Sequence, residues 1–169
     1  MAVLLVAWRS CCEASVDQMT PELVVLLVQP EYGEREMYAE FFRHQGWRAI
    51  PVSTARDALR VAPIADVIIT SILLPGHMDG VELIAQLKAD ERSKSIPVVV
   101  LTTCAWNAER ERAENAGCDA FLAKPCLPAD LVVAVRRVLA LCRVPKPQFA
   151  NVRPAATARV RRSSLSMRE

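Results

Sequence analysis

The sequence predicts an α/β protein in which one parallel sheet is covered by helices on both faces. Continuous, largely apolar stretches of strand length stand at 24–28 (VVLLV), 67–71 (VIITS) and 97–101 (PVVVL). Segments with apolar residues at helical spacing alternate with them, and five strand–helix pairs can be followed along the chain. Strands without a polar face are buried on both sides, which is typical of a parallel sheet between two helical layers.

The first two strand–helix pairs occupy residues 24 to 61. A helix is expected over 33–45, ending at Gly46. Its apolar face at helical spacing consists of Met37, Tyr38, Phe41 and Phe42. The second strand is short, and Pro51 places it near an edge of the sheet because proline has no N–H to donate. This strand is expected over 48–52, and its helix, capped by Ser53 or Thr54, over 55–61.

The last three strand–helix pairs follow the same order. The third pairs 67–71 with a helix over 81–87. The fourth pairs 97–101 with a helix over about 107–116, which Gly117 should end. The fifth strand is short, and the helix after it is long, amphipathic and has Pro128 in its first turn. These last two elements are expected over 120–123 and 127–142.

Length and charge indicate one soluble domain with two tails. The 169 residues are 52% hydrophobic and 24% charged, which suits a single globular core. From Arg143 onward seven basic residues stand against the single acid Glu169, so the net charge of +2 combines a mildly acidic body with a basic tail. We expect an extension over 1–22 that is disordered or precedes a true start at Met19, a domain over 23–142, and a disordered basic tail over 143–169.

The cysteines and the N-terminus indicate a reduced, cytoplasmic chain. None of the six cysteines forms a CxxC pair, and no histidine lies near them at metal-ligand spacing. The apolar run MAVLLVAW has no basic residue before it and is interrupted by Arg9. It fits neither a signal peptide nor a membrane span, which needs roughly 20 apolar residues. We therefore expect no membrane association.

Four stretches of the chain carry a resemblance to a known family. They are VVLLV followed six residues later by Glu34-Arg35, then ADVIITSILLPGHMDGVEL, IPVVVLTT, and AGCDAFLAKPCLPADLVVAVRRVL. Together they resemble the receiver domain of two-component response regulators, over residues 23–142. The resemblance implies the flavodoxin-like, doubly wound fold with strand order 2-1-3-4-5. It also implies a site at the carboxyl ends of the first, third, fourth and fifth strands.

The resemblance implies roles for particular positions. In that family an acidic pair ends the first strand, and an aspartate ending the third strand accepts phosphate from a histidine kinase. Mg²⁺ bridges these carboxylates. A hydroxyl residue on the fourth strand and a lysine on the fifth contact the phosphoryl group. Thr102 stands at the hydroxyl position, Lys124 at the lysine position and Phe121 at the aromatic switch position.

Three of the implied site positions carry no acid. Gln29 and Pro30 stand where the acidic pair belongs, and Ser71 stands where the phosphoacceptor belongs. Because Mg²⁺ prefers anionic oxygen ligands, a pocket that keeps Lys124 but loses these acids is predicted to bind no Mg²⁺. A rival alignment places Pro30-Glu31 at the acidic pair, which restores one carboxylate and leaves Ser71 unchanged.

Two site residues have alternative interpretations. A serine is a poor nucleophile without a general base, and His77 is the nearest histidine in sequence, so a Ser71–His77 pair is one route to an unorthodox acceptor. A strand-end serine that bonds a loop backbone group is the commoner case. Lys124 either holds a phosphate-mimicking anion, pairs with Glu31 or is solvated.

Three features outside these positions have a functional and a plain interpretation. Cys104 and Cys126 follow the fourth and fifth strands, so they form either a redox switch or ordinary buried thiols. Trp106 lies where the loop after the fourth strand enters its helix, and it either anchors a partner or packs on its own helix. The basic tail offers nucleic acid only weak contact through its charge.

These observations favour a stand-alone pseudo-receiver with no enzyme activity. It would act by binding a protein partner, such as a histidine kinase or another regulator. The alternatives are a phosphorylatable response regulator with an unorthodox acceptor and a thiol redox-responsive regulator. The sequence names neither the partner nor the oligomeric state.

Overall fold

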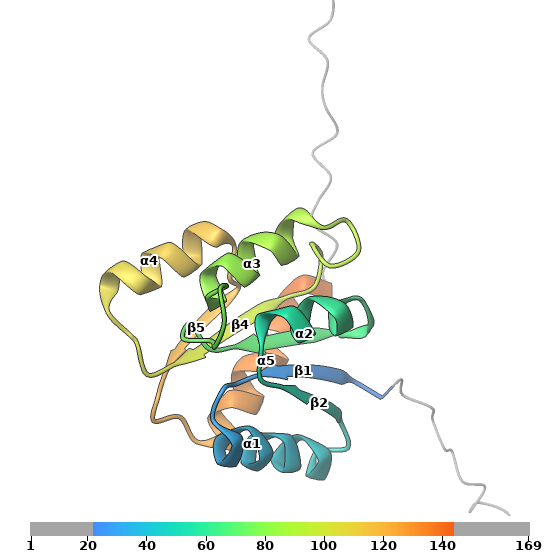
Figure 1. Cartoon of the computed structure of the whole chain (residues 1–169). Helices are drawn as coiled ribbons and strands as arrows, with labels where there is room; N and C mark the ends of the chain where they lie inside the picture. The colour runs from blue at the N-terminus through green and yellow to red at the C-terminus, as the bar shows by residue number, and fades with distance from the viewer. Residues whose placement is uncertain (1–21, 144–169) are drawn as a thin grey trace, which may run out of the picture.

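A computed structural model describes residues 22–143, where strands and α-helices alternate five times (Figure 1). The strands are β1 (Val24–Val28), β2 (Arg48–Val52), β3 (Val67–Thr70), β4 (Val98–Thr102) and β5 (Ala120–Ala123). The helices are α1 (Tyr32–His44), α2 (Ala55–Val61), α3 (Gly80–Ala89), α4 (Asn107–Ala116) and α5 (Pro128–Arg143). A short 3-10 helix, η1 (Ala62–Ile64), follows α2. The alternation confirms the predicted α/β architecture.

The five strands form one parallel sheet in the order β2-β1-β3-β4-β5, as predicted. The strand that carries Pro51 lies at the edge. Val28 pairs with Thr70, and Thr70 pairs with Val100, so β1, β3 and β4 reach the same end of the sheet almost in register. The loops after the strands therefore meet along one edge, which we call the carboxyl edge (Figure 1).

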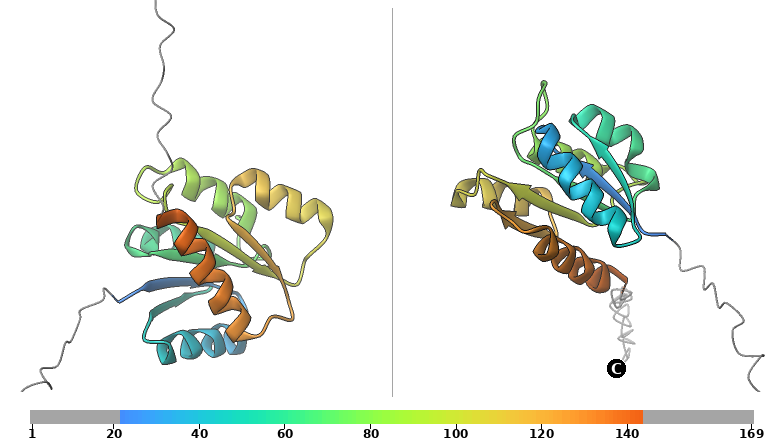
Figure 2. Two further views of the ribbon diagram at one scale, coloured as in Figure 1. Left: turned by 180° about the vertical axis from the view of Figure 1, so that it is seen from behind. Right: turned by 90° about the horizontal axis from the view of Figure 1, so that it is seen from below.

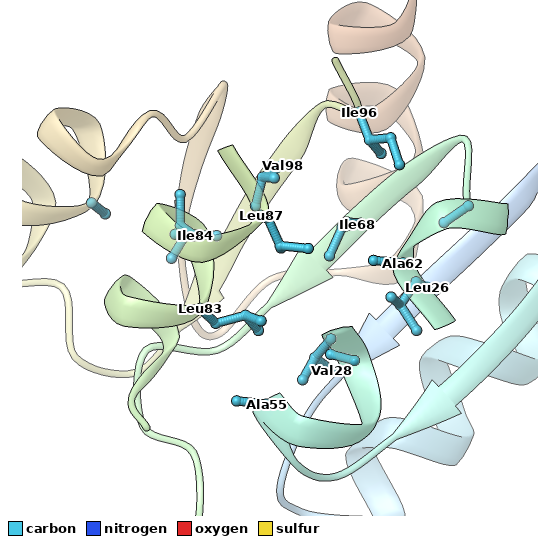
Figure 3. Close-up of a cluster of buried hydrophobic side chains, with 14 of the residues drawn as sticks. Leu26, Val28, Ala55, Ala62, Ile68, Leu83, Ile84, Leu87, Ile96 and Val98 are labelled. Atoms are coloured by element: carbon cyan, nitrogen blue, oxygen red, sulfur yellow. The ribbon is translucent and has the colours of Figure 1, made fainter. Parts of the chain in front are cut away.

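Two helical layers enclose the sheet. Helices α1 and α5 cover one face, and α2, α3 and α4 cover the other (Figures 1 and 2). Side chains alternate along β1, so that Leu26 and Val28 pack toward α2 and α3, whereas Val25 and Leu27 pack toward α1 and α5. Figure 3 shows the first of these two clusters, where side chains from β1, β3 and β4 meet those of α2 and α3. Burial on both faces explains why the strands read as continuous apolar runs.

Most predicted ends of the elements are correct within two residues. The third strand ends at Thr70, one residue earlier than predicted, so Ser71 begins the loop. Helix α3 begins at Gly80 because Asp79 and Glu82 form a capping box at its start. Thr54, rather than Ser53, caps α2 by accepting a hydrogen bond from the backbone of Asp57. The 3-10 turn η1 was not predicted.

Both predicted tails lie outside the described part of the chain. Residues 1–21, with the proposed start at Met19, and residues 144–169, with nearly all of the basic tail, are not described. Among residues 22–143 no helix is long and apolar enough to cross a membrane.

Gly80 should tolerate no side chain. A Cβ atom built there would lie 1.9 Å from the carbonyl oxygen of Ser71 and 2.8 Å from the Cα of Ile72. Because both atoms belong to the backbone, we expect Gly80→Ala to lower the free energy of unfolding by about 2 kcal/mol, as overpacking does. Urea unfolding measures this. The matched control is Gly33→Ala, where the nearest atom is the Glu31 carboxylate at 3.5 Å, and which should be neutral or slightly stabilising. Equal stability of the two variants would contradict the close approach.

Candidate functional site

Four strand ends bring the predicted site residues together at the carboxyl edge. The backbone of Ser71 donates to the carbonyl of Val28 over 3.0 Å, which places Ser71 beside the end of β1. The backbone of Lys124 donates to the carbonyl of Thr102 over 2.8 Å, which joins the ends of β5 and β4. The ends of β1, β3, β4 and β5 therefore lie together, as the strand order implied. What this edge can bind depends on the side chains that it carries.

Gln29 is the buried centre of this group. Its side chain follows β1 directly and is 0% exposed. The Nε2 atom donates to the carbonyl of Leu101 over 3.2 Å, and the Oε1 atom accepts from the Lys124 ammonium over 2.9 Å. An amide can make both contacts because it carries a donor and an acceptor. Gln29 thus links the ends of β1, β4 and β5.

Lys124 is paired within the protein. Its ammonium bonds both the Oε1 atom of Gln29 and the carboxylate of Glu34 on α1. The Lys124 side chain is 8% exposed and that of Glu34 is 33% exposed. The interpretation that Lys124 pairs with a carboxylate is therefore correct, but the predicted partner Glu31 is wrong.

Glu31 has a different task, which explains why it does not reach Lys124. Its carboxylate caps α1 by accepting hydrogen bonds from the backbones of Gly33 and Glu34. These backbone hydrogen bonds lower the pKa of the Glu31 carboxyl, and the positive charges of Arg35 and Lys124 add to the effect. Glu34 lies three residues further along the chain, in the first turn of α1, and its carboxylate contacts the Lys124 ammonium. The sequence carried a signal for it, because Glu34 stands in the first turn of a helix that begins at the carboxyl edge.

Arg35 is a second residue that the sequence analysis did not place. Its guanidinium donates from Nη1 to the carbonyls of Gln29, over 2.6 Å, and Pro30, over 3.1 Å. Pro30 itself is exposed and has no side-chain donor or acceptor. Arg35 thereby holds the turn between β1 and α1, and with it the backbone of Gln29.

Ser71 and Thr102 are both buried. The Thr102 hydroxyl accepts a hydrogen bond from the backbone of Cys104 over 3.1 Å, so it caps the turn after β4. His77 is exposed, and within residues 22–143 no hydrogen bond joins it to Ser71. The contact that would activate Ser71 as a nucleophile is not among the contacts of this part of the chain.

Phe121 and Trp106 differ in burial. Phe121 is partly buried against the cluster under α3 and α4, with the Arg110 guanidinium 4.6 Å from its ring centre. Trp106 is 75% exposed at the start of α4. The Trp106 side chain is therefore not buried against its own helix, and its role as a partner anchor stays a prediction.

Burial disfavours the ionisation of two thiols, Cys126 in the loop after β5 and Cys118 just before β5. Burial, followed by the charge of Asp130, raises the pKa of the Cys126 thiol. Burial, followed by the charge of Glu114, raises the pKa of Cys118 to about 11. Since the thiolate is the reactive form, these shifts disfavour reaction at neutral pH. A link between Cys104 and Cys126 stays a prediction.

Tyr38 ties α1 to the loop after β5. Its hydroxyl donates to the carbonyl of Cys126 over 2.7 Å, and burial, with the charges of Cys126 and Glu34, raises its pKa from 10 to about 12. A raised pKa favours the neutral phenol in the folded state. The neutral phenol therefore contributes to the free energy of unfolding in full below pH 10, and this contribution is lost as the pH rises from 10 to about 12.

We expect the native chain to lose stability over that pH range more steeply than Tyr38→Phe, which has no phenol to ionise at this position. The difference in slope should approach about 1.4 kcal/mol per pH unit. Denaturant unfolding of both proteins measures it, and the ultraviolet absorbance of the phenolate reports the ionisation itself. Parallel pH profiles would contradict the buried hydrogen bond.

Comparisons with known proteins agree with this architecture. A family model of the response regulator receiver domain matches residues 25–136. The chain is 33% identical over 125 residues to response regulator Rre1 of Synechocystis. The aligned residues make up 72% of this chain and 54% of that protein. It is 29% identical over 117 residues to the polar-differentiation response regulator DivK of Brucella ovis, covering 68% and 94%. It therefore spans about half the length of Rre1 and nearly all of DivK.

Two solved structures have the same fold. One is the receiver domain of a sensor histidine kinase of Pseudomonas aeruginosa, with a magnesium ion coordinated in its active-site cleft. It is 27% identical to this chain, with a TM-score of 0.65. The alignment covers 70% of this chain and 98% of the Pseudomonas domain. The other is the chemotaxis response regulator CheY4 of Vibrio cholerae, which is 27% identical, covers 69% and 98%, and has a TM-score of 0.64.

The strand order and the helical layers define a flavodoxin-like α/β domain, and its candidate site lies at the carboxyl ends of the strands. The match over most of the domain goes further: the chain belongs to the response regulator receiver domain family of two-component signalling. Receiver domains are signalling modules that interact with histidine kinases or other regulators.

Proposed function

We propose that this chain is a pseudo-receiver, a receiver domain that signals by binding a protein partner and is not itself phosphorylated. The observation that carries the proposal is the bonding of Lys124. Its ammonium is held by Glu34 and Gln29, in the place where the family would direct a lysine toward a phosphoryl group. Residues 23–142 form the working domain.

The donor set at the carboxyl edge does not fit Mg²⁺. A magnesium ion requires hard oxygen ligands, usually carboxylates, in octahedral geometry. Gln29 offers one amide oxygen, which already accepts from Lys124, and Pro30 offers no side-chain oxygen. The nearby carboxylates of Glu31 and Glu34 are bound to the start of α1 and to Lys124. The Pseudomonas receiver coordinates Mg²⁺ in its cleft; this site has an ammonium and an amide instead.

Phosphoryl transfer to Ser71 also lacks support. A serine hydroxyl needs a general base to attack, and the nearest histidine in sequence, His77, is exposed. Asp79, the acid at the end of this loop, accepts from the backbone of Glu82 and pairs with Arg112 at 3.2 Å. The Asp79 carboxylate therefore serves the structure of the loop and of α3, and we assign no enzymatic step to it.

A protein partner is the best-supported ligand, and we propose a histidine kinase or another regulator. Trp106 at the start of α4 is 75% exposed, and Leu127, just before α5, is also exposed. The two belong to the loops after neighbouring strands, β4 and β5. Exposed aromatic and aliphatic side chains of this kind are typical anchors of protein interfaces.

Fluorescence titration with Mg²⁺, followed by beryllofluoride as a mimic of the phosphoryl group, tests the proposal. We expect no saturable change in tryptophan emission at millimolar Mg²⁺, because the nearby carboxylates of Glu31 and Glu34 are already bonded to the start of α1 and to Lys124. The variant Trp106→Phe identifies the share of the signal that comes from the site. A saturable change that disappears in this variant would show a working phosphoryl pocket and overturn the proposal.

A further inference from the structure

Four groups form a continuous chain of contacts across the carboxyl edge. It runs from the Glu34 carboxylate on α1 to the Lys124 ammonium after β5, then to the Gln29 amide after β1, and ends at the carbonyl of Leu101 in β4. The members come from two distant parts of the chain, 29–34 and 101–124, and Gln29 is the residue that bonds both Lys124 and Leu101. Gln29 and Leu101 are 0% exposed, so water does not replace these contacts in the folded protein.

The far end of this chain of contacts adjoins the loop that presents Trp106. Leu101 is followed by Thr102, whose hydroxyl accepts from the backbone of Cys104 and whose carbonyl accepts from the backbone of Lys124. Trp106 then precedes α4 as its N-cap residue, with its side chain exposed. The position of β4 relative to β1 and β5 at this point therefore sets where the loop 103–106 starts.

Only an amide suits the Gln29 position in this network. Glutamate in its place would turn a carboxylate oxygen toward the Leu101 carbonyl, and two acceptors repel. Leucine would fill the space but leave both the Leu101 carbonyl and part of the Lys124 ammonium without a partner. The side chain is thus matched to its surroundings in donor, acceptor and length, which a residue left over from a lost acid need not be.

We propose that Gln29 is a lock: it holds the loop 103–106 and the start of α4 in one arrangement through the Glu34–Lys124–Gln29–Leu101 contacts. The inference rests on the proposed function, since a phosphorylated receiver would set this loop through its phosphoryl group. In this chain the surface around Trp106 is presented permanently, and a partner reads the presence of the protein rather than its phosphorylation.

Hydrogen exchange of the full chain, followed by mass spectrometry, tests the lock. Gln29→Leu should accelerate exchange in the peptides over 102–106 and 122–126 by about tenfold or more, as expected when buried hydrogen bonds are lost. Peptides of α2, which supplies no member of this chain of contacts, should exchange at the native rate. Glu34→Gln keeps the amide contacts and removes only the ion pair, so it should produce a smaller increase at the same peptides.

The matched control is Gln86→Leu, the same substitution at an exposed position of α3, which should leave all peptides unchanged. Native exchange over 102–106 in both Gln29→Leu and Glu34→Gln would overturn the lock. So would a rise that is equal throughout the chain in Gln29→Leu and absent in Glu34→Gln. The measurement contains no Mg²⁺ and no phosphodonor, so its failure is distinguishable from a failure of the proposed function, which the Mg²⁺ titration decides.

Discussion

Replacing Gln29, Pro30 and Ser71 together by aspartate should create a magnesium site. The three side chains start from neighbouring ends of β1 and β3, where Ser71 lies beside Val28. Without metal, the new carboxylates repel each other at a buried position, so the variant should be less stable than the native chain. Mg²⁺ should then restore stability, because it binds the folded state and not the unfolded one.

Thermal or urea unfolding with increasing Mg²⁺ measures this gain. At ten times the dissociation constant, the free energy of unfolding should rise by about 1.4 kcal/mol, and the native chain should show no such rise. The matched control carries asparagine at the same three positions, which keeps the size and removes the charge. A metal-dependent rise in the asparagine variant, or none in the aspartate variant, would contradict the assignment of these positions.

Replacing Lys124 by methionine should destabilise the chain by about 3 kcal/mol. Methionine keeps the unbranched side chain but removes the ammonium that binds Gln29 and Glu34. Breaking a buried ion pair by removing one partner typically costs about 3 to 5 kcal/mol, because the remaining charge loses its compensation. The Glu34 side chain is 33% exposed, so the expected cost lies at the lower end of this range. Urea unfolding measures the change.

Lys94→Met provides the control on the surface. Lys94 pairs with Glu91, but the two side chains are 50% and 82% exposed, so its loss should cost no more than about 0.5 kcal/mol. A double-mutant cycle of Lys124→Met with Glu34→Gln then isolates the interaction between the two groups. A Lys124→Met variant as stable as Lys94→Met would show that Lys124 is solvated in solution and that the buried pair is absent.

The fold could be predicted because its determinants are local and repeated. Runs such as VVLLV can be buried only between two helical layers, and Thr54, Gly117 and Pro128 mark the helix ends by their chemistry. Where the prediction missed, hydrogen bonds that apolar spacing does not record decide. Helix α3 begins at Gly80 rather than at 81 because Asp79 and Glu82 form the capping box at its start.

The site could be predicted only as a set of positions. The strand order brings Gln29, Ser71, Thr102 and Lys124 to one edge, as expected from the sequence. The partner of Lys124 could not be derived, since Glu31 and Glu34 are close in sequence. Glu31 caps the start of α1, whereas Glu34, in the first turn of this helix, contacts Lys124. The bond from Gln29 to Leu101 could not be derived either, because it joins the residue after β1 to β4, and these two strands are not neighbours in the sheet.

The absence of phosphorylation is the central claim, and the intact mass of the full chain after incubation with acetyl phosphate and Mg²⁺ tests it most directly. Acetyl phosphate supplies the phosphoryl group without a kinase, so no knowledge of the partner is needed. We expect the mass to be unchanged, because neither Ser71 nor Asp79 is equipped as an acceptor. A gain of one phosphoryl group, removed by mutation of the modified residue, would contradict the account and identify the acceptor.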